Sequence, residues 1–210
     1  MKVLLILPLL LLNVIGTFAQ DWRETTAVLV GGPCEGCEAI FEYGKMELKS
    51  VDTLPDFNKC LKIMVEGTIY QPDGKTPAAG VILYVYQTNE QGIYVTRGGE
   101  QGWAKRHGYI RGWIKTGEDG RYTFYTLKPG HYPGRTTPAH IHPTILEPDG
   151  RYYWLGSYHF AGDEFLTEKE ISPVLPRGGS TGLLELSKEG DLWVGKRDFI
   201  LGKNITNYND

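Results

Sequence analysis

The sequence has few cysteines, no excess of one charge and no internal repeat, and each shortage excludes a class of protein. Its 22 lysines and arginines are offset by 25 aspartates and glutamates, which gives a net charge of −3. This balance provides no strong attraction to nucleic acid or to an anionic membrane, so neither is expected as a partner. The absence of repeats and low-complexity tracts argues against a repeat protein and favours an ordinary globular domain.

Residues 1–20 predict a secretory signal peptide. Lys2 supplies the positive start, Val3–Ile15 the apolar core, and Thr17–Ala19 a small-x-small cleavage site. The apolar run is shorter than the ~20 residues that span a bilayer, so no membrane anchor is expected. We therefore expect an exported protein, either periplasmic or extracellular. The alternative for this segment is a buried N-terminal strand.

Three cysteines remain, Cys34, Cys37 and Cys60, and an exported protein can hold a disulfide. The odd number leaves one thiol free or paired elsewhere. We expect the disulfide to join Cys60 to one of the other two. Cys34-Glu-Gly-Cys37 could also be a redox pair or half of a zinc site. No second CxxC is present for zinc, and a thioredoxin-like role would need a βαβ context that the sequence does not show.

The remaining sequence predicts an all-β protein. Short segments rich in β-branched and aromatic residues alternate with Pro, Gly and Asp turns, a pattern typical of an antiparallel β-sandwich of the transthyretin (prealbumin) kind. Gly117–Gly120 predicts a tight turn that makes a hairpin of its two flanking strands. Two more strands are expected between Ser172 and Asp198. The main predicted strands are Leu61–Tyr70, Val81–Tyr86, Tyr109–Lys115, Arg121–Leu127, Ala139–Leu146 and Arg151–Leu155.

This pattern divides the chain into three parts. Residues 1–20 are the signal peptide, residues 21–60 an irregular N-terminal arm, and residues 61–210 the sandwich domain. Within the arm, Cys34–Met46 has room for one short helix, because glycines and prolines interrupt the pattern on both sides. The arm could mediate a homodimer or cover the pocket of a monomer.

The most informative motif is His140-Ile141-His142. Side chains alternate along a strand, so the two imidazoles point to one face and can converge on a single metal ion. Tyr132, eight residues before His140, adds a phenol to the same segment. Imidazole suits several transition metals, whereas phenolate is a hard anionic oxygen that favours a highly charged ion such as ferric iron.

The segment from Val65 to Phe165 resembles the intradiol ring-cleavage dioxygenases, which include the protocatechuate and catechol dioxygenases. The resemblance runs in the family's order and covers about half of the chain. The most specific matching motifs are Gly92-Ile-Tyr94, Leu127-Lys-Pro-Gly-His-Tyr-Pro133, Pro138-Ala-His-Ile-His142 and His159-Phe-Ala-Gly-Asp163.

The resemblance implies one non-haem Fe(III) per chain, held by Tyr94, Tyr132, His140 and His142. By position, Tyr94 and His142 correspond to the equatorial ligands, and Tyr132 and His140 to the axial ones. It also implies the reaction, in which O₂ opens a catechol ring between its two hydroxyl-bearing carbons. In the family, the axial tyrosinate leaves the iron and accepts a substrate proton, so Tyr132 is expected to be catalytic as well.

The sequence departs from the family pattern at two positions. The family usually has an arginine three residues before the first histidine, where Thr137 stands here. Arg135 is the nearest replacement to stabilise negative charge on the reacting ring, and Arg111 is the second candidate. Ser157 stands where the family often has a glutamine. Three further histidines lack ligand-like spacing and are expected to be structural: His107, His131 and His159. The alternative for His131, which adjoins Tyr132, is a place in the lining of the pocket.

Two alternatives remain open. Gly67–Val81 also resembles the opening of transthyretin-like domains, so a non-catalytic β-sandwich binding module is one of them. The other keeps a metal at the same residues but makes it copper or zinc, in a hydrolytic or oxidative enzyme. Asn204-Ile-Thr206 matches a glycosylation sequon, which matters only in a eukaryotic secretory pathway.

Overall fold

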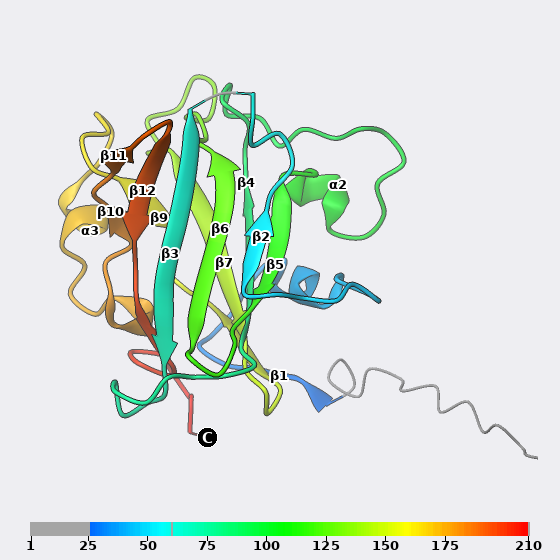
Figure 1. Ribbon diagram of the computed structural model, residues 1–210, viewed down its shortest axis with the longest axis vertical. Helices are drawn as coiled ribbons and strands as arrows, with labels where there is room; N and C mark the ends of the chain where they lie inside the picture. Colours follow the sequence, from blue (N-terminus) through cyan, green and yellow to red (C-terminus); the bar gives the residue numbers. More distant parts are fainter. Residues whose placement is uncertain (1–25, 60, 210) are drawn as a thin grey trace, which may run out of the picture.

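The protein is a two-layer β-sandwich, as predicted. In the computed structural model, which describes residues 26–59 and 61–209, two β-sheets pack face to face around one apolar core (Figure 1). The predicted signal peptide and Cys60 lie outside the described residues. Within the described part of the chain, every helix is too short or too polar to cross a membrane.

The first sheet carries the candidate site. Its central strands β8, β7, β4 and β5 pair antiparallel, whereas the short outer strands β1 and β10 pair parallel with β8 and β9. The strands are β1 (Val28–Leu29), β8 (Arg151–Trp154), β7 (His140–Leu146), β4 (Ile82–Gln87), β5 (Arg111–Lys115), β9 (Tyr158–Phe160) and β10 (Leu183–Leu184).

The second sheet is built around the antiparallel pair β3–β6, and three outer strands, β2, β12 and β13, pair parallel with this centre. Its strands are β11 (Ser187–Glu189), β12 (Leu192–Lys196), β3 (Lys62–Tyr70), β6 (Arg121–Leu127), β2 (Val51–Thr53) and β13 (Phe199–Ile200). Each of the main predicted strands begins within two residues of its predicted position.

The predicted hairpin between residues 109–115 and 121–127 is wrong. β5 pairs with β4 in the first sheet, and β6 pairs with β3 in the second. The turn between them therefore crosses from one layer to the other. Ile114 of β5 and Phe124 of β6 are both fully buried in the core between the sheets. The turn residues specify a reversal of the chain, but facing apolar side chains place the two strands in opposite layers.

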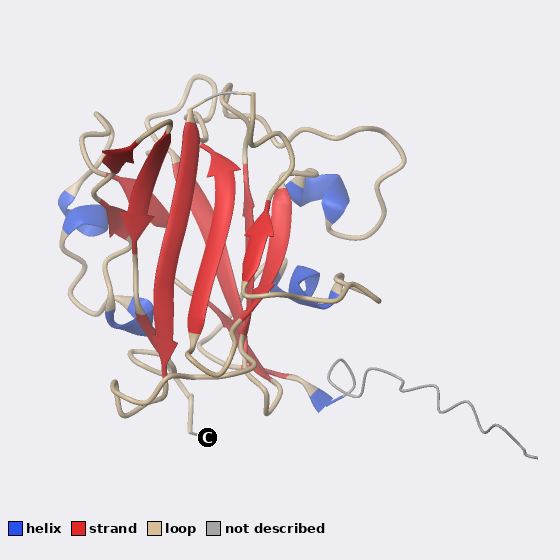
Figure 2. Cartoon of the chain, in the orientation of Figure 1, coloured by secondary structure: helices blue, strands red, loops and turns tan. Residues whose placement is uncertain are grey.

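The N-terminal arm covers the outer face of the first sheet. Its 3-10 helix η1 (Cys37–Phe41), the predicted short helix, buries Ala39 and Ile40 against Ile82, Tyr84 and Trp113 in a second apolar cluster. Full burial of a side chain such as Ile40 stabilises the fold by roughly 2 kcal/mol. The other short helices, α2 (Ala104–His107), α3 (Glu168–Ile171) and η2 (Arg177–Gly179), also lie outside the sheets (Figure 2).

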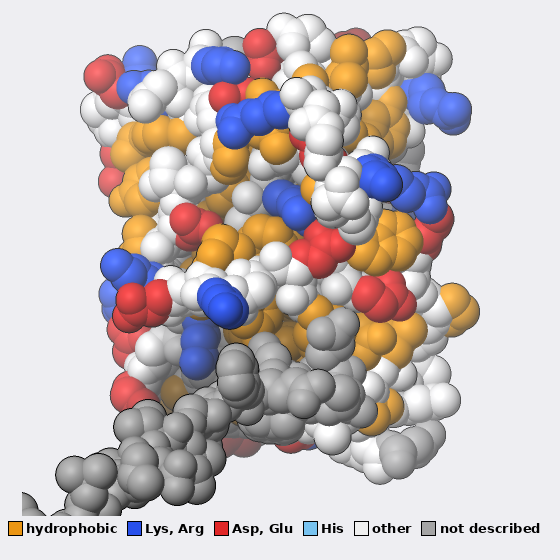
Figure 3. All heavy atoms as spheres, turned by 90° about the vertical axis from the view of Figure 1, so that its right-hand side faces the viewer, with side chains coloured by type: hydrophobic (Ala, Val, Ile, Leu, Met, Phe, Trp, Pro, Cys, Tyr) orange, Lys and Arg blue, Asp and Glu red, His pale blue; other side chains and the backbone are white. Residues whose placement is uncertain are grey.

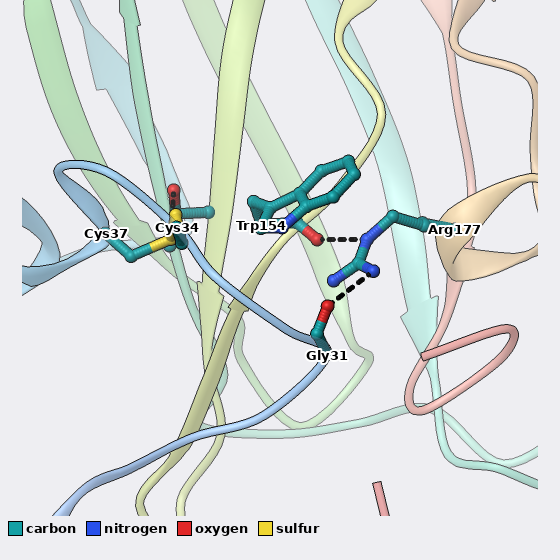
Figure 4. Close-up of a disulfide and its surroundings, with 6 residues drawn as sticks. Gly31, Cys34, Cys37, Trp154 and Arg177 are labelled. Atoms are coloured by element: carbon teal, nitrogen blue, oxygen red, sulfur yellow. Dashed lines mark hydrogen bonds between the residues drawn. A yellow bond between two sulfur atoms is a disulfide. The ribbon is translucent and has the colours of Figure 1, made fainter. Parts of the chain in front are cut away.

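The disulfide joins Cys34 to Cys37, so the predicted pairing with Cys60 is wrong (Figure 4). The two Cα atoms lie 5.7 Å apart, a separation that a disulfide spans without strain. Gly36 makes this approach possible, because its φ of 86° turns the backbone in a way that side chains disfavour. A Cβ at this position would also lie 2.6 Å from Nε2 of His107.

Charged residues of both signs share the surface that carries η1 and α2. Figure 3, which faces this side of the molecule, shows basic and acidic side chains intermingled with apolar ones. The mixture agrees with the small net charge of the sequence.

Candidate metal centre

β7 presents the two histidines on the outer face of the first sheet. Ile141, between them, is fully buried in the core, as the period-2 pattern predicted. In the strand register, His140 lies opposite His159 of β9, and His142 lies opposite Tyr86 of β4. β7 therefore lies between β4 and β9 here, and these strands hold the backbone of the two histidines from opposite sides.

Four side chains meet at this position and form a closed ring of contacts. The Tyr94 hydroxyl lies 2.6 Å from the Tyr132 hydroxyl and 3.0 Å from Nε2 of His142. Nε2 of His140 lies 3.1 Å from the Tyr132 hydroxyl and 3.0 Å from Nε2 of His142. The structure thus brings together all four residues that the family resemblance implied as ligands. Donor atoms bound about 2 Å from one ion are separated by similar distances.

The two loops that carry the tyrosines are joined to each other. The Gly130 and Gly92 amides both donate to the Asn89 carbonyl, at 2.9 and 3.0 Å. The Asn89 side chain accepts from Ile93 N–H, one residue before Tyr94. At Gly92, whose φ is 76°, a Cβ would lie 1.6 Å from the His131 carbonyl oxygen. Only glycine therefore allows the Tyr94 loop to approach the Tyr132 loop so closely.

The hydrogen bonds of His140 show which of its nitrogens faces the cluster as an acceptor. Its Nδ1 lies 2.6 Å from the Pro138 carbonyl, which can only accept, so Nδ1 carries the proton. Nε2 then has a free lone pair, directed at Nε2 of His142. Two ring nitrogens at this distance need a proton or a metal ion between them. The donor set therefore fits a bound cation.

Burial keeps all four groups neutral in the absence of an ion. It raises the pKa of the Tyr94 phenol, with a further contribution from Tyr132, and it also raises the pKa of Tyr132 itself. Burial likewise lowers the pKa values of His140 and His142, so both imidazoles stay in the form that binds metals. A bound cation can displace the phenolic protons. Two phenolates with two neutral imidazoles suit a hard ion such as ferric iron.

This cluster depends on tyrosine. Across residues 26–59 and 61–209, no group of three or more His, Cys, Asp or Glu residues is placed to hold a metal. Structural zinc sites are built from four Cys and His ligands, and catalytic ones usually from three His, Cys or acidic ligands. The chemistry of the donors at this site therefore differs from that of a common zinc site.

A stack of three rings holds His142 from the side. Tyr86 lies parallel to His142, with ring centroids 4.6 Å apart, and His107 lies on the other face of Tyr86 at 3.7 Å. His107 is fixed in turn by a 2.9 Å hydrogen bond between its Nδ1 and the Tyr84 hydroxyl. Sequence reasoning assigned no role to Tyr86. Its alternation with Tyr84 gave the face, but only the strand register shows that it reaches His142.

The structure brings neither candidate arginine to the cluster. Arg135 is exposed, and its side chain makes no hydrogen bond or ion pair with any described residue. Arg111 forms an ion pair with Glu42 at 2.5 Å and stacks on Trp113. Its register partner is Tyr86, so Arg111 lies two strands, roughly 10 Å, from His142. A role for Arg135 in stabilising the reacting ring stays a prediction.

A cavity of about 370 Å³ lies beside His142, between the arm and the outer face of the first sheet. The disulfide turn forms part of its wall, and Tyr86, Trp154 and Ser157 contribute to the rest. Arg177 ties this region together, because it donates to the carbonyls of Trp154 on β8 and Gly31 of the arm (Figure 4). Its guanidinium also stacks on the Trp154 indole, 3.7 Å from the ring centroid.

Comparisons of the sequence identify related proteins. The family model described as Dioxygenase matches residues 41–177. Catechol 1,2-dioxygenase 1 of Acinetobacter lwoffii is 28% identical over 189 residues, which cover 79% of this chain and 58% of that protein. The protocatechuate 3,4-dioxygenase beta chain of Burkholderia cepacia is 28% identical over 160 residues, which cover 69% and 66%. The matches thus span about six-tenths of the length of these curated relatives.

Solved structures show the same fold. The dioxygenase domain of a dioxygenase carbohydrate-binding protein fusion from Streptomyces sp. SirexAA-E matches with a TM-score of 0.53 and 24% identity, covering 76% of this chain and 94% of that chain. The intradiol ring-cleavage dioxygenase from Tetranychus urticae matches with a TM-score of 0.53 and 19% identity, covering 81% and 90%. At these identities the likeness is one of fold.

Proposed function

Because this chain belongs to the dioxygenase family, we propose that it is an intradiol enzyme, which uses O₂ to open a catechol-type ring between the two hydroxyl-bearing carbons. The observation that carries the proposal is the ring of contacts among Tyr94, Tyr132, His140 and His142. We propose that these four residues hold one Fe(III) per chain. A binding module would not need two phenols and two imidazoles converging in this way, and hard phenolates favour iron over zinc or copper.

Ferric iron, when bound there, would supply a Lewis-acidic centre that orients the diol and polarises its oxygens. The residues supply charge and proton transfer. Two phenolates offset two of three positive charges, and the neutral imidazoles leave that balance unchanged. Tyr132 precedes an exposed turn at Pro133-Gly134, where Gly134 has a φ of 70°. We propose that its phenolate oxygen accepts a proton from a substrate hydroxyl.

We propose that the ring of the substrate occupies the cavity beside His142. Its volume of about 370 Å³ is in the range of small-molecule sites and larger than a bare catechol requires. Among the described residues that line it, Glu35 is the one carboxylate, and none is lysine or arginine. A ring carboxylate is usually recognised by a cation. Glu35 itself forms an ion pair with Arg106. The lining therefore favours catechols with neutral substituents over carboxylated ones.

We also propose that the protein is exported, since residues 1–20 have the pattern of a signal peptide. The arm packs on its own domain, and homodimer formation stays a prediction.

The test is the purified protein reconstituted with iron. It should bind one iron per chain and show a broad visible band from phenolate-to-iron charge transfer. An anaerobic titration with small catechols should shift this band. Admission of O₂ should then consume one equivalent and give a ring-opened diacid. Protein that is fully loaded with iron but colourless, or that leaves catechols unchanged, would contradict the proposal.

A further inference from the structure

Asp163, in the loop after β9, places a buried carboxylate behind the candidate metal centre. Its side chain is 2% exposed. One oxygen, Oδ2, accepts the Ala139 N–H at 3.0 Å and lies 2.8 Å from Nε2 of His131. The other oxygen accepts the Phe165 N–H at 3.0 Å. Ala139 and His131 are the residues that immediately precede His140 and Tyr132.

The contact with Ala139 continues to His140 through a single peptide group. The Ala139 N–H and the Pro138 carbonyl belong to the same planar amide. The N–H donates to Asp163, while the carbonyl accepts the Nδ1 proton of His140 at 2.6 Å. The carboxylate, the peptide group and the imidazole thus form one chain of hydrogen bonds. Its far end is the His140 Nε2 lone pair that faces the cluster.

Hydrogen bonds in such a chain strengthen one another. An N–H that donates to a carboxylate makes the carbonyl of the same peptide a better acceptor. A better acceptor at Pro138 fixes the Nδ1–H tautomer of His140 and makes its Nε2 more basic. In many metalloproteins a carboxylate does this by contacting the histidine directly, and loss of such a partner weakens metal binding. Here the peptide group lies between the two.

A second arm of the same carboxylate reaches the Tyr132 loop. His131 packs edge-on against Phe165, with ring centroids 4.7 Å apart, and its Nε2 contacts Asp163. Asp163 therefore fixes the backbone on both sides of the 3.1 Å contact between Tyr132 and His140. Without it, each segment would keep only its own loop hydrogen bonds.

We propose that Asp163 is a positioning residue of the metal centre, acting on His140 through the Pro138–Ala139 peptide group and on Tyr132 through His131. This inference rests on the proposed function, because it assigns a role toward the iron that the four residues would hold.

The main experiment is Asp163→Asn in the full chain, with iron affinity measured by competition against a chelator. The amide keeps the size of the side chain but removes the charge and one accepting position. We expect the iron dissociation constant to rise roughly 10- to 100-fold. The matched control is Asp198→Asn, which also removes a carboxylate that accepts a backbone N–H, from Thr68 at 2.7 Å on the second sheet. Its iron affinity should equal that of the wild type.

The His131 arm has its own pair of variants. Gln retains a nitrogen donor at about the reach of Nε2, whereas Ala removes it. His131→Ala should shift the visible iron–phenolate band and lower kcat more than it changes KM, and His131→Gln should restore the wild-type band. Equal spectra for His131→Ala and the wild type would overturn this arm of the proposal.

The outcomes separate this inference from the proposed function. If the wild type binds no iron, the proposed function fails. If the wild type is coloured and active but Asp163→Asn has the same iron affinity and spectrum, only the inference fails. Should Asp163→Asn not fold, nitrogen NMR of the metal-free wild type decides. An Nδ1–H tautomer for His140 supports the hydrogen-bond chain, and an Nε2–H tautomer overturns it.

Discussion

The hydroxyl oxygens of Tyr94 and Tyr132 lie 2.6 Å apart, although the two residues are 38 positions apart in the sequence. Both phenols are neutral without an ion, because burial raises their pKa values. If Fe(III) binds to these phenols as we propose, it would release two protons, and each phenolate would contribute separately to the charge balance and to the colour of the complex.

Single and double tyrosine variants test this division. Tyr94→Phe and Tyr132→Phe should each keep a visible band, shifted because one phenolate remains, and the double variant should lose it. Tyr132→Phe should also reduce turnover by roughly 100-fold or more, as expected for loss of a positioned base. The measurement is absorption of iron-loaded protein with O₂ uptake. Tyr125→Phe, on the second sheet, is the control and should leave both unchanged.

Histidine variants test the nitrogen ligands. His142→Ala and His140→Ala should each lose bound iron, measured as iron per chain after dialysis, because each variant removes one of the two imidazole ligands. His159→Gln is the informative comparison. Its ring lies 6.0 Å from that of His140, centroid to centroid, but outside the ring of four contacts. Iron loss in this variant would show that the structural role expected for His159 is wrong.

The charge of the cavity lining predicts the preference among substrates. Anaerobic titration, followed by quenching of tryptophan fluorescence, should give tighter binding for 4-methylcatechol than for its 4-carboxylate analogue. Glu35→Lys should reduce the ratio of the two dissociation constants by about 5-fold, because an exposed charge contributes about 1 kcal/mol at most. Glu118→Lys is the control, because it makes the same change of charge at the turn between β5 and β6, away from the cavity. A carboxylated catechol that binds best to the wild type would refute the assignment.

His107 predicts a pH dependence of stability. Burial, with the nearby Arg111 guanidinium, lowers its pKa to about 4 from an ordinary value of 6.5. The unfolded chain therefore binds a proton between these values that the folded protein does not. This contribution is fully present above pH 6.5 and is lost as the pH falls toward 4. Its size is on the order of 2 kcal/mol after allowance for solvent screening.

Urea denaturation from pH 7 to pH 4 measures this contribution. His107→Asn, which can still accept from the Tyr84 hydroxyl, should lose most of the slope between pH 6.5 and 4. Carboxylate titrations will remain in both proteins at the acidic end. Identical slopes in this range would mean that His107 is protonated as easily in the folded protein as in the unfolded chain.

Removal of the Cys34–Cys37 disulfide should affect stability and catechol binding but leave metal binding unchanged. Cys34→Ser with Cys37→Ser should lower the free energy of unfolding by about 2 kcal/mol, the loop-closure term for a four-residue loop. Affinity for catechols should fall, because the turn is part of the cavity wall. Iron content should stay at the wild-type value, since neither Cys34 nor Cys37 forms a hydrogen bond with the four residues of the cluster. Parallel loss of iron would show that the turn supports the metal centre directly.

Local patterns were enough to predict the strands and the shared face of His140 and His142. Alternation along a strand depends on a few neighbouring residues, and the short helix at Cys37–Phe41 also depends on local sequence. The family resemblance added Tyr94, which no local spacing distinguishes from the tyrosines near it. Together these observations predicted the sandwich and the four side chains that meet at the candidate site, but they also predicted an arginine there, and neither Arg135 nor Arg111 reaches the cluster.

Relationships across the chain could not be predicted in the same way. The crossing between β5 and β6 depends on which layer each strand joins, and the turn residues are the same in either case. The pairing of Cys34 with Cys37 depends on the backbone turn at Gly36. Asp163 and Tyr86 reach the site through loop closure and strand register, which are set by packing over many residues.

His107, which stacks on Tyr86 and through it on His142, lies directly beside Gly36, inside the disulfide turn of the arm. Residues 26–59 are therefore part of the structure that supports the candidate site. A chain shortened to begin at Leu61 would lose the contact with the His107 ring, one wall of the cavity and strand β2 together. Any homologue or designed variant that exchanges the arm would have to exchange the residues facing it as well.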